Sequence, residues 1–147
     1  MTTTAAPADS RTTALAHYAA RAVLETVLAR HDLDFQQSVT LRPVAVAGTP
    51  VERAALVGEV VASLKADPAV VERTVDELAG KGLIEPEGSA VCVTDAGRAL
   101  FTAVSAETGE VSARIYAGIP EEDLIATGRV LHLVTERADA ELAALKA

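Results

Sequence analysis

The stretch that decides the fold is residues 67–101, "DPAVVERTVDELAGKGLIEPEGSAVCVTDAGRALF". Its first part carries the signals of a helix. Asp67 is a favourable N-cap, and Pro68 stands at the first helical position, where its missing N–H costs nothing. The "GKG" segment ends the pattern at Gly82, because glycine is typical of the position after a helix. We therefore expect a helix from Pro68 to about Gly82.

The second part of the stretch predicts a hairpin and then another helix. Two β-prone runs, residues 83–85 and 90–93, flank "PEGS" at 86–89, whose composition favours a turn. Thr94 is a plausible N-cap for the helix that follows. The order helix, compact hairpin, helix is the central feature of the predicted architecture.

Three further helices are expected before this stretch. They cover about residues 12–30, 34–48 and 49–66. The first is apolar on more than one side, which indicates burial on several sides and, so close to a chain end, a partner subunit. In the second, Asp34 is a plausible N-cap and Gly48 a plausible end, while Pro43 is expected to bend or shorten the helix.

The end of the chain predicts two long helices, one from Thr94 to Gly118 and one beginning near Pro120. The last helix has an apolar residue at every seventh position: Leu124, Leu131, Ala138 and Leu145. Such a repeat is typical of a seam against another helix. A dimer seam is the preferred interpretation, and an ordinary core stripe is the alternative.

The composition predicts a small protein with an aliphatic core. Half of the 147 residues are hydrophobic, but only four are aromatic, which favours helices packed by Leu, Val and Ala over a β-sandwich. We expect one domain over residues 12–147, after a short disordered tail at 1–11. A single cysteine, Cys92, excludes an internal disulfide and fits a reducing compartment.

No segment indicates export or a membrane span. No apolar run reaches 18 residues, and "MTTTAAPADS" at 1–10 lacks the basic start and apolar centre of a signal peptide. The net charge of −8, from 21 acids and 13 bases, predicts a soluble chain without non-specific affinity for phosphate. We expect a cytoplasmic protein without a membrane partner.

The chain carries no motif of a metal, cofactor or catalytic site. It has no CxxC, HExxH, GxSxG, P-loop or Rossmann fingerprint, so no metal, no cofactor and no catalytic residues are expected. Cys92 alternates with Val91 and Val93 in its strand, and faces outward if those valines face in. No basic residue is adjacent, which favours a plain strand residue over a redox sensor.

Two junctions and one helix of this chain resemble those of a known family. They are "VDELAGKGLIE" (Val75–Glu85), "VTDAGRALF" (Val93–Phe101) and, more loosely, "FQQSVTLRPVA" (Phe35–Ala45). With this order of elements, the chain resembles the MarR family of winged-helix transcription regulators over residues 12–146.

The resemblance implies a mainly α fold with a small β-wing and a winged helix-turn-helix at residues 34–98. It implies an intertwined homodimer formed by the helices at 12–31 and 94–146. It also implies that one recognition helix per subunit enters the major groove of double-stranded DNA, with the wing at the minor groove. A small-molecule effector would bind between the dimerisation core and the DNA-binding lobe.

The resemblance also implies that Val70, Glu72 and Arg73 are the positions that read bases and phosphates. In a regulator that binds DNA, Thr74 would join Arg73 at base edges or phosphates, and Lys65, Lys81 and Ser89 would serve as phosphate anchors. The family usually has small hydroxylated residues at the positions of Val70 and Glu72 and arginine at that of Arg73. Only Arg73 follows that pattern, and the wing tip lacks the basic cluster that the family carries there.

The charge of residues 52–98 opposes DNA binding. Five bases and nine acids give 5 − 9 = −4 for the lobe, whereas affinity for duplex DNA depends largely on neutralised phosphates. Glu72 can still accept a hydrogen bond from cytosine N4. Two alternatives therefore stay open: a winged-helix dimer that has lost DNA and serves as a small-molecule binder or enzyme, and a module that binds a protein partner.

Candidate ligand-binding residues lie mainly on the first helix. They are His17, Tyr18, Arg21 and Arg42. This set could bind an anionic or phenolic ligand, and His17 could serve as a general base. The other interpretation is a solvated helix face on which Arg21 pairs with Glu25 four residues later.

Overall fold

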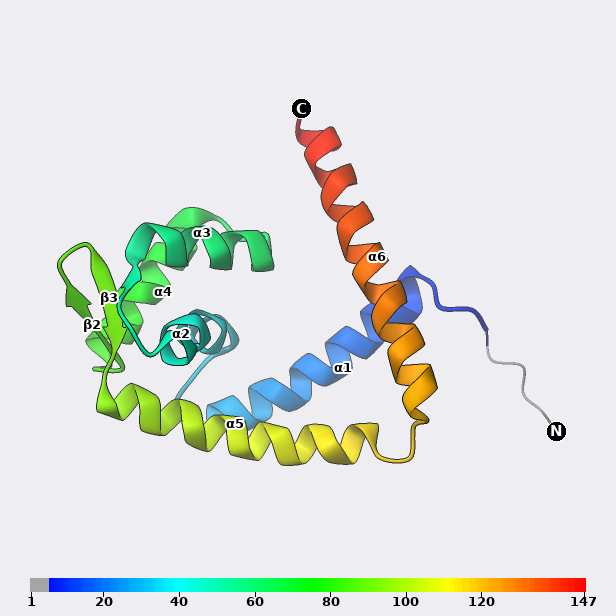
Figure 1. The fold of residues 1–147 in the computed structure, drawn as a ribbon, viewed down its shortest axis with the longest axis horizontal. Helices are drawn as coiled ribbons and strands as arrows, with labels where there is room; N and C mark the ends of the chain where they lie inside the picture. The colour runs from blue at the N-terminus through cyan, green and yellow to red at the C-terminus, as the bar shows by residue number, and fades with distance from the viewer. Residues whose placement is uncertain (1–5) are drawn as a thin grey trace. The chain divides into compact units, whose positions relative to one another are not determined.

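The structure is a computed structural model that describes residues 6–147. Its elements, in chain order, are α1 (Ser10–Ala29), α2 (Phe35–Ala47), β1 (Val51–Glu52), α3 (Arg53–Leu64), α4 (Pro68–Gly80), β2 (Ile84–Glu87), β3 (Ala90–Val93), α5 (Asp95–Tyr116) and α6 (Glu121–Lys146) (Figure 1). The predicted tail at 1–11 falls partly outside the described residues, and α1 already begins at Ser10.

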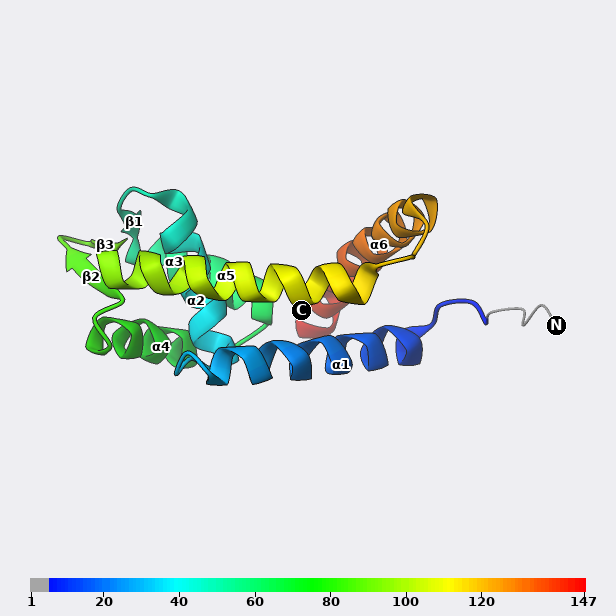
Figure 2. The same ribbon diagram turned by 90° about the horizontal axis from the view of Figure 1, so that it is seen from below.

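The chain forms two compact units, one up to Gly109 and one from Glu110. The first holds the helix-turn-helix and the strands, which lie at the same end of this unit as α4 in both views (Figures 1 and 2). Its three strands form an antiparallel sheet in the order β1-β3-β2, so the predicted hairpin is joined by a short strand that the sequence did not indicate. Val51 of β1 pairs with Val91, and Ile84 of β2 pairs with Val93.

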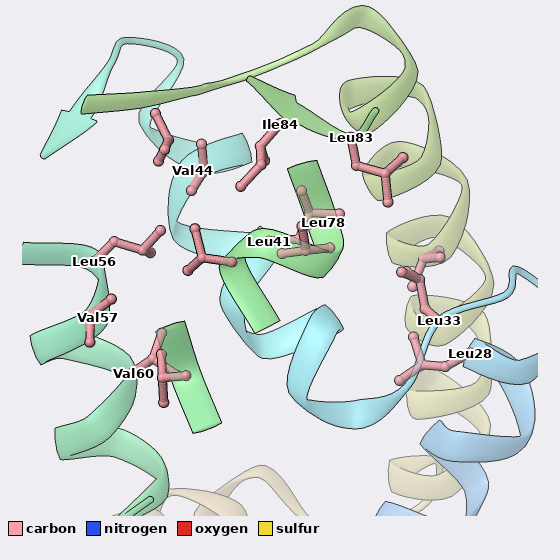
Figure 3. Packing of buried hydrophobic residues seen from close by; sticks show 14 residues of the cluster. Leu28, Leu33, Leu41, Val44, Leu56, Val57, Val60, Leu78, Leu83 and Ile84 are labelled. Carbon is pink, nitrogen blue, oxygen red and sulfur yellow. The ribbon is translucent and has the colours of Figure 1, made fainter. Parts of the chain in front are cut away.

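The core of the first unit is aliphatic, as the composition predicted. Its fully buried large side chains include Leu28, Leu41, Leu56, Leu78 and Ile84. Figure 3 shows Leu41 beside Leu78 in the middle of this cluster, with Leu28 and Leu33 to one side. Each buried leucine stabilises the fold by about 1.5–3 kcal/mol relative to an exposed one. This core fixes α4 against α2 and α3 and so determines which face of α4 remains outside.

Local signals set the ends of α2. The Asp34 carboxylate accepts from the Gln37 backbone N–H at 2.8 Å, and the Asp34 N–H donates to the Gln37 side chain at 3.2 Å, which is a capping box. Gly48 ends the helix in the left-handed region at φ +66°. Pro43 lies within the helix, which continues to Ala47, so this proline does not shorten it.

The second unit is dominated by α6. None of the 26 residues of this helix is buried. Among the predicted seam residues, Leu131 is 43% and Leu145 83% exposed, and Ile125 and Val134 nearby are also exposed. Within residues 6–147 the apolar repeat is therefore exposed, apart from Leu124, which is half-buried. No helix within residues 6–147 is long and apolar enough to cross a membrane.

Candidate nucleic-acid interface

The turn between α3 and α4 gives α4 its position. Lys65 ends α3 in the left-handed conformation at φ +53°, and the Asp67 carboxylate caps α4 by accepting from the Ala69 N–H at 2.8 Å. The apolar face of α4, which includes Val71 and Leu78, is buried in the core. The opposite face is left exposed at the surface of the lobe.

Arg73 lies on this exposed face. It has no ion pair or side-chain hydrogen bond with any residue in the described range 6–147. Among the other predicted contacts on α4, Val70 is half-buried. Arg73 therefore presents a guanidinium whose five N–H donors are open to a ligand.

Thr74 lies on the inner side of α4. Its side chain is 4% exposed, and its hydroxyl donates to the Val70 carbonyl at 3.0 Å. Gln36 of α2 approaches the same hydroxyl at 3.5 Å. Thr74 thus takes part in the packing of α4 against α2 in this structure, rather than pointing away from the lobe.

Glu72 is held by an arginine that the sequence analysis did not select. Arg53, the first residue of α3, donates to the Glu72 carboxylate from Nε at 2.8 Å and from Nη2 at 2.7 Å. Nη2 also bonds Asp76 at 2.9 Å and the Glu72 carbonyl at 3.2 Å. The hydrogen bond that Arg53 donates to Glu72, and then the one that it donates to Asp76, raise the pKa of Arg53, so the guanidinium stays charged.

Lys81 ties the end of α4 to the turn between α1 and α2. Its ammonium group donates to the Asp32 carbonyl and, at 3.2 Å, to the Gln37 side chain. Gln37 in turn donates to Glu77 at 3.0 Å. Lys81 and Glu77 are therefore both engaged within the lobe, and Gln37 is a second residue that the sequence analysis missed.

The two other predicted anchors also have partners inside the protein. Lys65 donates to the Ala62 carbonyl at 2.6 Å, and the Ser89 hydroxyl donates to Glu52 at 2.8 Å. The tip of the wing turns at Gly88 with φ +62°. Within the hairpin β2–β3, no side chain is basic. The wing therefore offers neutral and acidic groups to a ligand.

Cys92 sits on the outer side of the wing, while Val91 is buried. Its thiol lies 3.3 Å from a carboxylate oxygen of Glu87. Desolvation, and then the hydrogen bond and charge of Glu87, raise the pKa of the Cys92 thiol. A raised pKa disfavours the reactive thiolate.

Comparisons with known proteins show which fold this chain has. No protein-family model and no curated protein sequence matches the chain. Among solved structures, CouR from Rhodococcus jostii RHA1 bound to p-coumaroyl-CoA is similar with a TM-score of 0.71 and 19% identity, over 84% of this chain and 88% of that one. The chain has the MarR winged-helix fold.

Two further structures with the MarR fold support this assignment. A MarR-family transcriptional regulator from Rhodococcus sp. RHA1 has a TM-score of 0.69 at 20% identity, over 83% of this chain and 89% of that one. The reduced form of MarR from E. coli has a TM-score of 0.68 at 17% identity, over 88% and 95%. The predicted fold class, mainly α with a β-wing, is confirmed.

The candidate ligand residues lie on two helices of the MarR fold. The rings of His17 and Tyr18 meet edge to face with centroids 6.0 Å apart, and Arg21 lies 4.2 Å above the Phe35 ring while bonding Glu25 at 3.0 Å. Arg42 is exposed on α2, and within residues 6–147 it makes no hydrogen bond or ring contact with the other three. No three His, Cys, Asp or Glu side chains in that range converge as a metal site requires.

The sequence analysis also missed a cluster that joins the turn after α1 to α5. Glu107 bonds His31 Nε2 at 2.8 Å and also pairs with Arg30. The hydrogen bond from His31, and then the one from Arg30, lower the pKa of Glu107. His31 and Glu107 are 76 positions apart, so no local pattern could have paired them.

Proposed function

We propose that this protein is a transcription regulator that binds double-stranded DNA through its helix-turn-helix and wing. The observation that carries the proposal is Arg73, which stands on the exposed face of α4 without a partner among residues 6–147. An arginine on such a helix can bond a guanine edge or a phosphate. The MarR fold supports this function, because the similar structures include transcription regulators.

The DNA-facing surface that we propose comprises the exposed face of α4 and the wing. Arg73 is the direct contact, and Val70 borders it. Thr74 is buried and holds α4 against α2. Lys65, Lys81 and Ser89 hold their elements in place through hydrogen bonds within the lobe, and can exchange those bonds for phosphate contacts. Glu72 also lies on α4, but its carboxylate is paired with Arg53.

We also propose that the working form is a homodimer. The exposed apolar residues of α1 and α6, among them Leu15, Val23, Leu131 and Val134, support it. Exposed apolar surface of this extent favours a protein interface. A regulator of this form would bind two half-sites related by the symmetry of the dimer.

A small-molecule effector completes the proposal. One similar structure is a complex with p-coumaroyl-CoA, which shows that the fold accommodates an organic ligand in that protein. For this chain we propose that the effector contacts the surface around His17, Tyr18 and Arg21, with Arg42 as a further cation on α2. A polar aromatic pair and an arginine suit an anionic or phenolic ligand.

The test measures binding of the purified protein to a fluorescent duplex from its own upstream region, against a random duplex of equal length. We expect preference for the upstream duplex, and a loss of about 1–3 kcal/mol in Arg73→Ala. Arg129→Ala, which removes an exposed arginine of α6, is the matched control and should bind normally. Equal affinity of the folded protein for both duplexes would overturn the proposal.

A further inference from the structure

Arg53 stands where three parts of the lobe meet. It is the first residue of α3 and follows β1 directly, and its backbone N–H donates to the carbonyl of Ser89 in the wing at 3.1 Å. Its side chain reaches across to Glu72 and Asp76 on α4. Arg53 therefore links both elements that the proposed function directs toward DNA, with its backbone at the wing and its guanidinium at α4.

The contacts of this guanidinium have the form of a phosphate contact. Nε and Nη2 donate to carboxylate oxygens at 2.7–2.9 Å, and a guanidinium recognises the oxygens of a carboxylate or a phosphate with the same fork of donors. Nη1 has no hydrogen bond to any residue within 6–147. Two carboxylates thus occupy Nε and Nη2, and Nη1 is left open within residues 6–147.

The group is accessible rather than buried. The Arg53 side chain is 34% exposed, and those of Glu72 and Asp76 are 46% and 70% exposed. Exposed ion pairs of this kind contribute little to folding and are weakened by salt. An approaching phosphate can therefore compete for Arg53 without opening the core.

We infer that Arg53 is a phosphate-binding residue of the DNA interface, and that Glu72 and Asp76 occupy it in the free protein as an internal substitute for DNA phosphates. The inference rests on the proposed function for its ligand. It assigns Glu72 a role as a competitor within the lobe instead of a reader of bases. DNA binding then includes the exchange of the two carboxylates for a phosphate at Arg53.

The experiment compares wild type, E72Q/D76N, R53A and the triple variant R53A/E72Q/D76N on a random duplex from about 50 to 200 mM salt. Each new phosphate contact steepens the log–log salt slope by about 0.9, which is roughly 3.5-fold over this range. We expect E72Q/D76N to bind more tightly than wild type, because no carboxylate competes for Arg53, and R53A to bind with a slope shallower by about 0.9. The triple variant should lose the gain in affinity of E72Q/D76N, because the residue that supplies the phosphate contact is gone.

Glu77→Gln is the matched control. It removes one carboxylate from the same helix, but Glu77 bonds Gln37 and not Arg53. The affinity of Glu77→Gln for the duplex should rise only because one negative charge is lost. The rise should be the same whether Arg53 is present or replaced by alanine. A gain in E72Q/D76N that persists in full in the triple variant would overturn the inference.

A second measurement follows Arg53 in the wild-type protein itself. The Arg53 Nε–H signal, assigned by its loss in R53A, should shift when the random duplex is added to wild type, as its acceptor changes from Glu72 to phosphate. An unchanged signal in the saturated complex would contradict the exchange. The two proposals can fail separately. The proposed function fails if the protein shows no preference for the upstream duplex. This inference fails if the salt slope of DNA binding does not depend on Arg53.

Discussion

The carbonyl oxygen of Leu83 lies 2.0 Å from the position that a Cβ on Gly97 would occupy. The same carbonyl accepts from the Thr94 N–H at 3.1 Å, and the Thr94 hydroxyl accepts from the Gly97 N–H at 3.0 Å. The first turn of α5 is thus packed directly on the backbone of Leu83, the residue before β2. Only a residue without a side chain allows this approach.

Replacing Gly97 by alanine is expected to lower the free energy of unfolding by roughly 3 kcal/mol or more, because a backbone atom must move to admit the methyl group. Urea denaturation measures the loss. Gly58→Ala, in the middle of α3 with nothing within 4 Å of its Cβ position, is the control and should gain about 0.5–1 kcal/mol from helix propensity. Equal stability of the two variants would refute the close packing at this junction.

Thr40 offers a stabilising substitution. It is fully buried in α2, and its hydroxyl has no hydrogen-bond partner among residues 6–147. Valine has nearly the same shape without the unpaired polar group, so Thr40→Val should raise the free energy of unfolding by about 1 kcal/mol. Thr40→Ser keeps the hydroxyl and removes the methyl group, and should instead be destabilising. Thermal melts of both variants measure these changes. A valine variant less stable than wild type would contradict an unpaired Thr40 hydroxyl.

The contact of Glu107 with His31 and Arg30 predicts a loss of stability in acid. The pKa of Glu107 is lowered below its ordinary 4.5 in the folded protein, so the unfolded chain binds the proton first. The stabilisation of the folded protein by the Glu107 carboxylate is complete above about pH 4.5, and it is lost as the pH falls through the lowered pKa. The gap in urea midpoint between wild type and Glu107→Gln should therefore narrow from about pH 6 to about pH 3.

A suitable control for this experiment is Glu59→Gln. Glu59 is exposed and has no side-chain partner within the described part of the chain. Its gap from wild type should stay constant over the same pH range. A constant gap for Glu107→Gln as well would show that this carboxylate is not held by its neighbours in solution.

The exposed repeat of α6 predicts that Leu131→Glu weakens self-association. A buried leucine contributes about 2 kcal/mol, so the Kd of the dimer should rise more than roughly tenfold. Sedimentation equilibrium measures this change. Ala143→Glu adds the same charge on the side of the helix away from the repeat, and should leave the Kd unchanged. A wild-type chain that sediments as a monomer would remove the basis for the homodimer.

Elements with strong local signals could be predicted from the sequence. The start of α4 follows from Asp67 and Pro68, and the end of α2 follows from Gly48, because caps and turns depend on a few neighbouring residues. Strand β1 was missed because it has two residues and depends on pairing with β3, about 40 positions away. Local sequence propensity cannot predict pairing with a strand so far away in the sequence.

The candidate site was less predictable, and for two different reasons. The bonds from Arg53 to Glu72 join residues on separate helices, so no spacing rule could find them. The inward position of Thr74, in contrast, could have been found. It lies three residues after Val71 and four before Leu78, on the apolar side of the helical repeat.

The direct succession of β1 and α3 has a mechanical consequence. Arg53 follows a strand that is hydrogen-bonded to β3, and its N–H is bonded to Ser89 at the wing. A rigid displacement of the wing must therefore carry the first turn of α3 with it and change the reach of the Arg53 guanidinium. We therefore expect a ligand that moves the wing to move the start of α3 as well, and one that moves the start of α3 to move the wing.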